Sequence, residues 1–158
     1  MDAISTEAVN ALQLAITGLL PPVAAPVLPS VVHIYPTQIA TTGIGGFVGI
    51  NQNPIGEIKG RRVSAKILID VRATTAEALD TAVSNTAVAL LAADRATLTQ
   101  QGILRLALGE VGERSVVGVG ADVTVQKRMT FSALFEFLKL PADGEGVIRQ
   151  IPININAQ

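Results

Sequence analysis

A run of strict two-residue alternation most limits the folds open to this chain. In residues 62–71, apolar side chains occupy every second position, and Leu68 is the only apolar residue among the positions between them. Because successive side chains of a β-strand point to opposite faces of a sheet, this pattern predicts a strand with one buried face. Thr74 and Glu77 follow at the spacing of a helix capping box, so a helix is predicted directly after the strand.

Two more strands are predicted after this helix. The apolar stripe of the helix is expected to contain Leu79, Val83, Ala87, Leu90 and Leu91. Asp94 starts a predicted short turn of helix that runs through Gln101, and Gly102 fits the C′ position after it. Residues 103–108 then alternate as a strand does. Residues 128–140 are predicted to form a long strand in which both faces are partly apolar. Such a strand is expected to be central in its sheet or covered on both sides.

The first thirty residues combine a predicted helix with a proline-rich connector. Residues 5–20 repeat apolar side chains at helical spacing, with Ser5 or Thr6 as the expected N-cap. Pro21 and Pro22 end this helix, and the sequence that follows favours an extended chain. The prolines interrupt the apolar run, and lysine and arginine are absent from the first 58 residues. Neither a membrane span nor a signal peptide is therefore predicted.

Two glycine-rich segments, residues 36–60 and 109–127, lack a regular pattern. Both are predicted to be extended loops or hairpin arms, because long irregular segments in compact domains tend to be functional or to carry hidden structure. The first arm follows a short strand at residues 31–35, which Pro36 is expected to stop. The second arm is expected to be a mobile hairpin.

A last strand is predicted at residues 147–155, after a turn that begins at Pro141. Its Pro152 favours an edge position in the sheet. The order of elements predicts a single α+β domain over residues 1–158. We expect a mostly antiparallel sheet with one main helix packed on one face and an additional N-terminal helix.

Composition excludes several classes of chemistry. The chain has no cysteine, which excludes disulfides, thiolate metal sites and cysteine nucleophiles, and its single histidine, His33, excludes a site with several histidine ligands. The net charge of −1 lacks the basic excess that is typical of nucleic-acid-binding proteins. Motifs for a serine nucleophile elbow or a P-loop are also absent from the sequence. We expect no enzymatic activity, no cofactor and no metal.

Charged residues at the ends of the predicted strands are the candidate interface. Two basic pairs stand where an irregular segment enters a strand, and a pair of carboxylates lies in a glycine-rich turn. They would meet charges of opposite sign on a neighbouring subunit, and solvated strand ends and turns are the alternative interpretation. A second carboxylate pair, Asp143 and Glu145, has the same solvated interpretation. The candidate interface residues are Arg61, Arg62, Glu110, Glu113, Lys127 and Arg128.

The balance of apolar and charged residues favours association with other chains. Hydrophobic residues make up 49% of the sequence and charged residues 16%, against about 25% charged in an average soluble domain. Aromatic residues make up only 3%, too few to fill a large core by themselves. We therefore expect part of the apolar surface to be buried against partner chains. If the partners are copies of this chain, the same contact repeated between them gives a closed ring when the rotation from copy to copy completes a full turn.

Three consecutive segments carry a resemblance to a known family. The sequences KILIDVRATTAEALDTAVSNTAVAL, ILRLALGEVG and KRMTFSALFEFLKL have the order and size of elements of the tail-terminator (tail-completion, head–tail joining) proteins of long-tailed bacteriophages. The resemblance implies a homohexameric ring in the virion, at the head-proximal end of the tail. Such a ring caps the tail tube protein, joins neck or stopper proteins and, in contractile tails, holds the sheath protein. It implies no cofactor and no catalytic residue, and DNA passes through the bore without sequence recognition.

The sequence is also compatible with other functions. The chain is also compatible with another neck or stopper, tail-tube or baseplate subunit. A small oligomeric ligand-binding or enzymatic α+β protein would use Glu110, Asp122 or His33. A self-assembling shell or scaffold module unrelated to phages is a third possibility.

Overall fold

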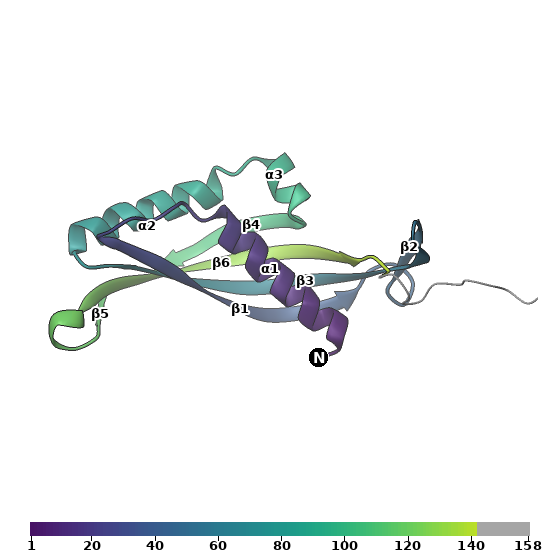
Figure 1. The fold of residues 1–158 in the computed structure, drawn as a ribbon, viewed down its shortest axis with the longest axis horizontal. Helices are drawn as coiled ribbons and strands as arrows, with labels where there is room; N and C mark the ends of the chain where they lie inside the picture. The colour runs from purple at the N-terminus through teal and green to yellow at the C-terminus, as the bar shows by residue number, and fades with distance from the viewer. Residues whose placement is uncertain (142–158) are drawn as a thin grey trace, which may run out of the picture.

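The computed structural model describes residues 1–141 and has an α+β fold built on one antiparallel sheet. The strand order is β1-β3-β6-β4, with β2 added beside β3 and β5 beside β6. The molecule is elongated, with the β2 hairpin at one end and β5 at the other (Figure 1). The strands are β1 (Val27–Thr41), β2 (Phe47–Gln52), β3 (Ile55–Ala73), β4 (Ile103–Val111), β5 (Ser115–Val117) and β6 (Thr124–Lys139). The helices are α1 (Ala3–Leu19), α2 (Ala76–Leu91) and α3 (Arg95–Gln100).

Strand β3 is a central strand of the sheet and contains the predicted alternation. It pairs with β1 on one side and with β6 on the other, and its buried apolar positions are every second residue from Val63 to Ala73. The strand prediction for residues 62–71 is confirmed. The strand starts earlier than predicted, at Ile55, because its first residues pair with β2 in a hairpin.

Both long helices pack on the same buried face of the sheet. Leu12 and Ile16 of α1 join Leu79 and Leu90 of α2 in one core with the alternate residues of β3 and β6. The predicted stripe of α2 is confirmed except at Leu91, which is half exposed. In residues 1–141, none of the helices is long and apolar enough to cross a membrane.

Helix starts differ from the predictions by one to a few residues. Helix α1 is capped by Asp2, whose Oδ1 accepts a hydrogen bond from the backbone N–H of Ser5 at 2.7 Å, so the predicted cap at Ser5 or Thr6 is wrong. Helix α2 is capped by Thr75 rather than by Thr74. The backbone N–H of Thr74 donates instead to Pro26 O at 3.0 Å, which keeps this residue with the strands.

The two predicted arms contain more strand than expected. Strand β1 continues through Pro36 to Thr41, so the predicted stop at Pro36 is wrong. Because β1 lies at the edge of the sheet, the missing N–H of proline costs no ladder bond, and a register shift accommodates it between Pro36 and Gln38. Residues 36–60 therefore hold the end of β1, the whole of β2 and the start of β3.

The second arm, residues 109–127, is largely paired as well. It holds the end of β4, the short β5 and the start of β6, with a turn of 3-10 helix at Gly120–Asp122. Glycines at positive φ, such as Gly118, confine the irregular backbone to the turns. The expected hairpin is present and consists of β5 and the start of β6, which pair with each other. The predicted strand at residues 147–155 lies outside the described residues, as do Asp143 and Glu145.

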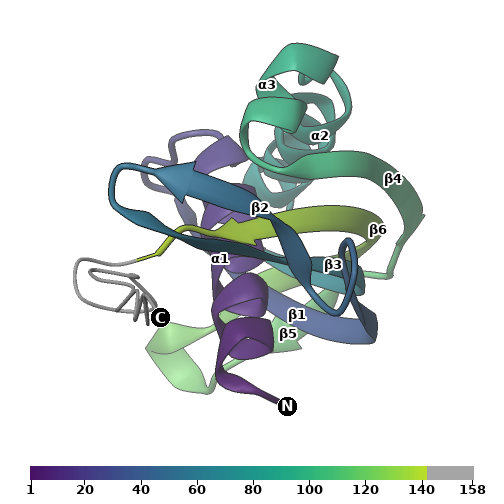
Figure 2. The same cartoon turned by 90° about the vertical axis from the view of Figure 1, so that its right-hand side faces the viewer.

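Strand β6 is central, as predicted, because it lies between β3 and β4. Its aromatic face, with Phe131 and Phe135, is buried beneath the helices. On the opposite face, Ser132 and the other alternate residues of β6 are exposed or half-buried. We call this side, which none of the helices in residues 1–141 covers, the open face of the sheet. Figure 2 looks along the sheet from the β2 end.

Candidate functional site

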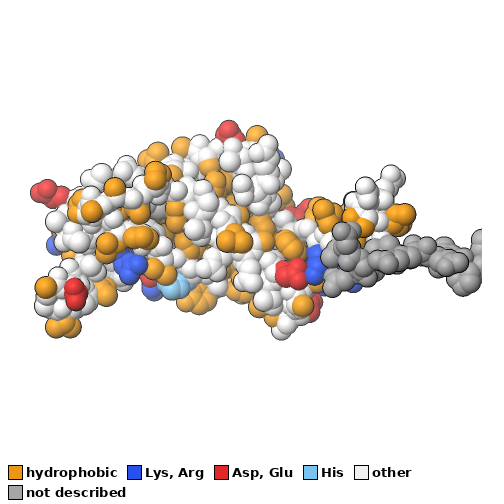
Figure 3. Space-filling model, in the orientation of Figure 1, with side chains coloured by type: hydrophobic (Ala, Val, Ile, Leu, Met, Phe, Trp, Pro, Cys, Tyr) orange, Lys and Arg blue, Asp and Glu red, His pale blue; other side chains and the backbone are white. Residues whose placement is uncertain are grey.

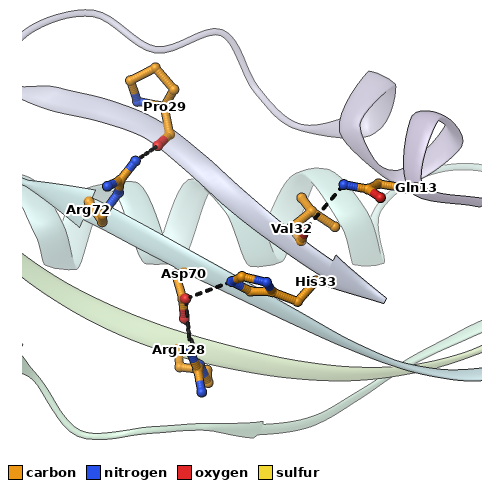
Figure 4. Close-up of polar contacts among 7 residues, drawn as sticks. All are labelled: Gln13, Pro29, Val32, His33, Asp70, Arg72 and Arg128. Atoms are coloured by element: carbon orange, nitrogen blue, oxygen red, sulfur yellow. Dashed lines mark hydrogen bonds and ion pairs between the residues drawn. The ribbon is translucent and has the colours of Figure 1, made fainter. Parts of the chain in front are cut away.

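Three polar side chains, Asp70, Arg128 and His33, come from three neighbouring strands and meet on the open face. Asp70 of β3 receives two hydrogen bonds from Arg128 of β6, from Nε to Oδ1 at 2.7 Å and from Nη2 to Oδ2 at 3.0 Å. His33 Nε2 of β1 lies 3.2 Å from the same Oδ2 (Figure 4). The carboxylate is therefore held from both sides and joins β1, β3 and β6.

The register of the sheet explains this cluster. Asp70 lies directly opposite Arg128 in the β3–β6 pair, and side chains at opposite positions of antiparallel strands are close enough to interact. On the other side, His33 pairs with Leu68, two residues before Asp70 on the same face. Asp70 is 6% exposed, although it lies between the core residues Ile69 and Val71 of the alternating strand.

The contact between Asp70 and Arg128 shifts the pKa values of these two residues. The hydrogen bonds from Arg128 lower the pKa of Asp70 below its ordinary value, and His33 adds to this effect, while partial burial opposes it. The Asp70 carboxylate in turn raises the pKa of Arg128. Both shifts favour the ionised pair. A buried carboxylate is costly unless it is paired and hydrogen-bonded, and Arg128 meets that requirement.

The four candidate cations form ion pairs within their own chain. Consecutive residues of a strand face opposite sides, so each basic pair divides between the two faces. The partners are Asp2 for Arg61, Glu136 for Arg62, Asp80 for Lys127 and Asp70 for Arg128. Arg61 and Arg62 lie in the middle of β3, and not at the strand entry where the sequence placed them. Their use in an interface between subunits stays a prediction.

The candidate carboxylates are at the solvent-exposed end of β4. Glu110 lies opposite Thr130 on β6, and Glu113 lies between β4 and β5. Both are exposed, and neither forms an ion pair with a described residue. Asp122 is exposed in the turn between β5 and β6. The structure thus brings His33 to Asp70, and it does not join His33 to Glu110 or Asp122.

Asp70 is the site residue that the sequence reasoning missed. It stands in a strand of otherwise strongly apolar character, and a lone carboxylate in such a strand indicates a buried partner. Its partners come from strands 37 and 58 residues away in the sequence, and only the register identifies them. Chemically, the cluster can hold three strands together and present a polar patch. In the described part of the chain, no group of three or more histidine, cysteine, aspartate or glutamate side chains is arranged to hold a metal ion.

Two of the hollows that lie away from this cluster have a mainly apolar lining. A pocket of about 350 Å³ lies between the proline-rich connector and α2, and its walls include Pro21, Pro26 and Ala82. Glu77 and Asn85 are among its polar groups. A larger hollow of about 650 Å³ lies at the β2 end of the molecule, and we call it the end groove. Its apolar walls are Ile4, Phe47, Ile50, Ile55, Leu140 and Pro141.

Comparison with known proteins gives no relative for this chain: no protein-family model matches it, and a search of curated proteins returns no match.

Proposed function

We propose that this chain is a structural virion protein that forms a ring, caps the tail tube and joins the tail to the neck proteins. The proposal names a tail terminator, with a homohexamer as the expected assembly. Its partners are the tail tube protein, neck or stopper proteins and, in a contractile tail, the sheath protein. DNA crosses the bore of the ring without sequence recognition.

The observation that carries the proposal is apolar surface left over after the core is complete. Residues 1–141 enclose one core beneath two helices, yet many large hydrophobic side chains outside it are exposed. They include Ile44, Ile50, Val116 and Val119, all in the segments predicted to be arms. Figure 3 shows hydrophobic side chains spread along this face of the molecule, including its two ends. Exposed apolar area of this extent marks contact with partners.

The sheet also has two open edges. Within the described residues, β1 and β4 each pair with one strand only, and β2 and β5 extend these edges toward the two ends of the molecule. An elongated subunit with different features at its two ends suits head-to-tail association, which produces rings when the rotation closes. The resemblance of the sequence to tail-terminator proteins supports a position of the ring at the head-proximal end of the tail.

Electron microscopy and native mass spectrometry of the purified chain test the ring directly. We expect a ring of six subunits with an open bore. Mixing this protein with growing tail tubes then tests the role, because a terminator binds one end of a tube and halts its growth. Incorporation along the tube would identify a tail-tube subunit, and binding only to isolated neck or baseplate complexes would identify one of those components. A stable monomer at micromolar concentration would contradict the ring.

The pocket beneath the connector favours a second candidate, a small ligand-binding protein. Its volume is at the lower end of the range for ligand sites, which starts at about 300 Å³. Glu110, Asp122 and His33 do not line it, so a ligand there would meet Glu77 and Asn85 instead. A metabolite screen by thermal shift tests this candidate. A reproducible stabilisation that Asn85→Ala abolishes would support it over the ring.

A further inference from the structure

The two ends of the long axis carry different apolar features. At one end, the end of the β5–β6 hairpin, residues 116–123, exposes Val119 at 89% and Val116 at 66%, and we call this segment the tip. At the opposite end lies the end groove, a hollow of about 650 Å³ whose walls include Phe47, Ile50 and Ile55. Figure 1 places β5 and β2 at opposite ends of the molecule. One end therefore projects apolar side chains, and the other offers an apolar hollow.

We propose that the tip of one copy of this chain inserts into the end groove of the next copy. The proposal rests on the ring proposed above and names the contact that builds it. The occupant of the groove is a second copy of the chain, and Val119 is its central side chain. Each copy contributes one tip and one groove, so the interface is heterologous.

The tip is shaped in advance for such an insertion. Gly118 adopts a φ of +97°, and a Cβ at this position would lie 2.5 Å from the backbone oxygen of Asp122. The turn therefore closes tightly, and it is anchored by β5, whose three residues pair with β6. An ordered turn loses less conformational entropy on binding than a flexible loop does.

Charge at the two ends is complementary. Asp122 is the only charged residue of the tip and is exposed. The groove is bordered by Lys59 of β3, which forms no ion pair with a described residue, and by Lys139, which bonds Glu7 at 2.8 Å. Among residues 1–141, Glu57 is the one acidic residue of the border. Asp122 can therefore meet Lys59, and this pair orients the tip in the groove. A contact between two tips or between two grooves would instead bring like charges together, which is unfavourable.

The edges of the sheet offer a poorer contact than the ends. Strand β1 has prolines at positions 29 and 36, and its pairing with β3 is shifted twice. The pairing of β4 with β6 is also shifted twice, between Ile103 and Arg105 and between Leu108 and Glu110. Prolines and bulges on edge strands prevent pairing with another sheet. The exposed apolar area of the hairpins is thus the better surface for a neighbouring copy.

Two single substitutions test the contact from its two sides. Val119→Asp places a charge on the tip, and Ile50→Asp places one in the groove. Both side chains are exposed in the subunit, so circular dichroism and the melting temperature of the monomer should not change. Each variant should be monomeric, with the dissociation constant raised about a hundredfold or more, because burial of an unpaired charge is unfavourable.

Mixing the two variants gives the most specific result. The Val119→Asp chain retains an intact groove, and the Ile50→Asp chain retains an intact tip, so the mixture should form a one-to-one heterodimer and stop there. Analytical ultracentrifugation measures this outcome. A contact between like ends would leave one of the two variants able to associate with itself, because only one of the two substitutions would lie in that contact.

Val88→Asp is the matched control, because Val88 is exposed on α2 and outside both features. It should leave the assembly unchanged, and equal disruption by this variant would overturn the proposal. Rings that persist in both end variants would also overturn it while leaving the tail-terminator proposal intact. Disruption by Ile50→Asp alone would show that another segment occupies the groove, which contradicts insertion of the tip. A wild-type monomer that fails to assemble at any concentration would refute both proposals.

Discussion

Replacement of Asp70 by asparagine tests whether the carboxylate holds the three strands together. Asparagine keeps the size of the side chain and removes its charge. A hydrogen bond to a charged group contributes about 1.5–3 kcal/mol, and Asp70 accepts two from Arg128. Because Arg128 is half exposed, solvent screens part of this interaction. We therefore expect Asp70→Asn to lower the free energy of unfolding by about 1–2 kcal/mol at neutral pH.

The pH dependence of this loss is a stricter test. The folded protein lowers the pKa of Asp70 below its ordinary value of 3.8, chiefly through Arg128. The ionised carboxylate therefore stabilises the fold above the unfolded-state pKa, and this contribution is lost as the pH falls through the lower, folded-state pKa. The difference between wild type and Asp70→Asn should be constant above about pH 5 and should shrink in stronger acid.

Urea unfolding of the monomeric chain at several pH values measures both the loss of stability in Asp70→Asn and its pH dependence. Asp80→Asn is the control, since it breaks the exposed pair with Lys127 and should change the unfolding midpoint much less. A double-mutant cycle with Arg128→Gln measures the interaction free energy between Asp70 and Arg128. This interaction should account for most of the stability lost in Asp70→Asn. A loss that is equal at neutral and acid pH, or a cycle without coupling, would refute the assignment.

Three further substitutions test the fold. Leu90→Ala should lower the free energy of unfolding by about 2–5 kcal/mol in urea titrations, whereas Leu91→Ala, on the exposed side of α2, should change it by less than about 0.5 kcal/mol. Thr75→Ala removes the cap of α2 and should cost about 1 kcal/mol by the same assay, and an equal cost from Thr81→Ala would contradict the assigned cap. Gly102→Ala should lower the melting temperature and Gly49→Ala should lower it much less, because only Gly102 has a positive φ and a backbone oxygen 2.7 Å from the added Cβ.

Local patterns were enough to predict the core elements of this fold. Alternation in residues 62–71 and the aromatic face of residues 128–140 depend on neighbours in the sequence, and both appear as central strands of the sheet. The short helix begins at its Asp94 cap for the same reason. Pro36 misled the prediction because its effect depends on strand position, and an edge strand tolerates a proline that a central strand would not.

The candidate site was less accessible to sequence reasoning. The cations at positions 61, 62, 127 and 128 were singled out as interface residues, and their partners within the chain were not predicted. Those partners, such as Asp2 for Arg61 and Asp80 for Lys127, lie 47 to 74 residues away, so their identity follows from the sheet register and helix packing. His33 stood in a predicted strand, and only the pairing of β1 with β3 places it beside Asp70.

Assembly through a tip and a groove would make ring formation strongly cooperative. In an open chain of subunits, each addition forms one contact, but the last step forms a contact within the same assembly at a high effective concentration. The closed ring therefore gains one contact more than the open chain of equal length, and partial assemblies are depleted. The mild substitution Val119→Ala weakens every contact of the ring, so the small losses of binding free energy add up over the whole assembly. Mass photometry of a dilution series should show rings and monomers only, with the transition moved to higher concentration in Val119→Ala. A ladder of dimers, trimers and longer chains would contradict closure by this contact.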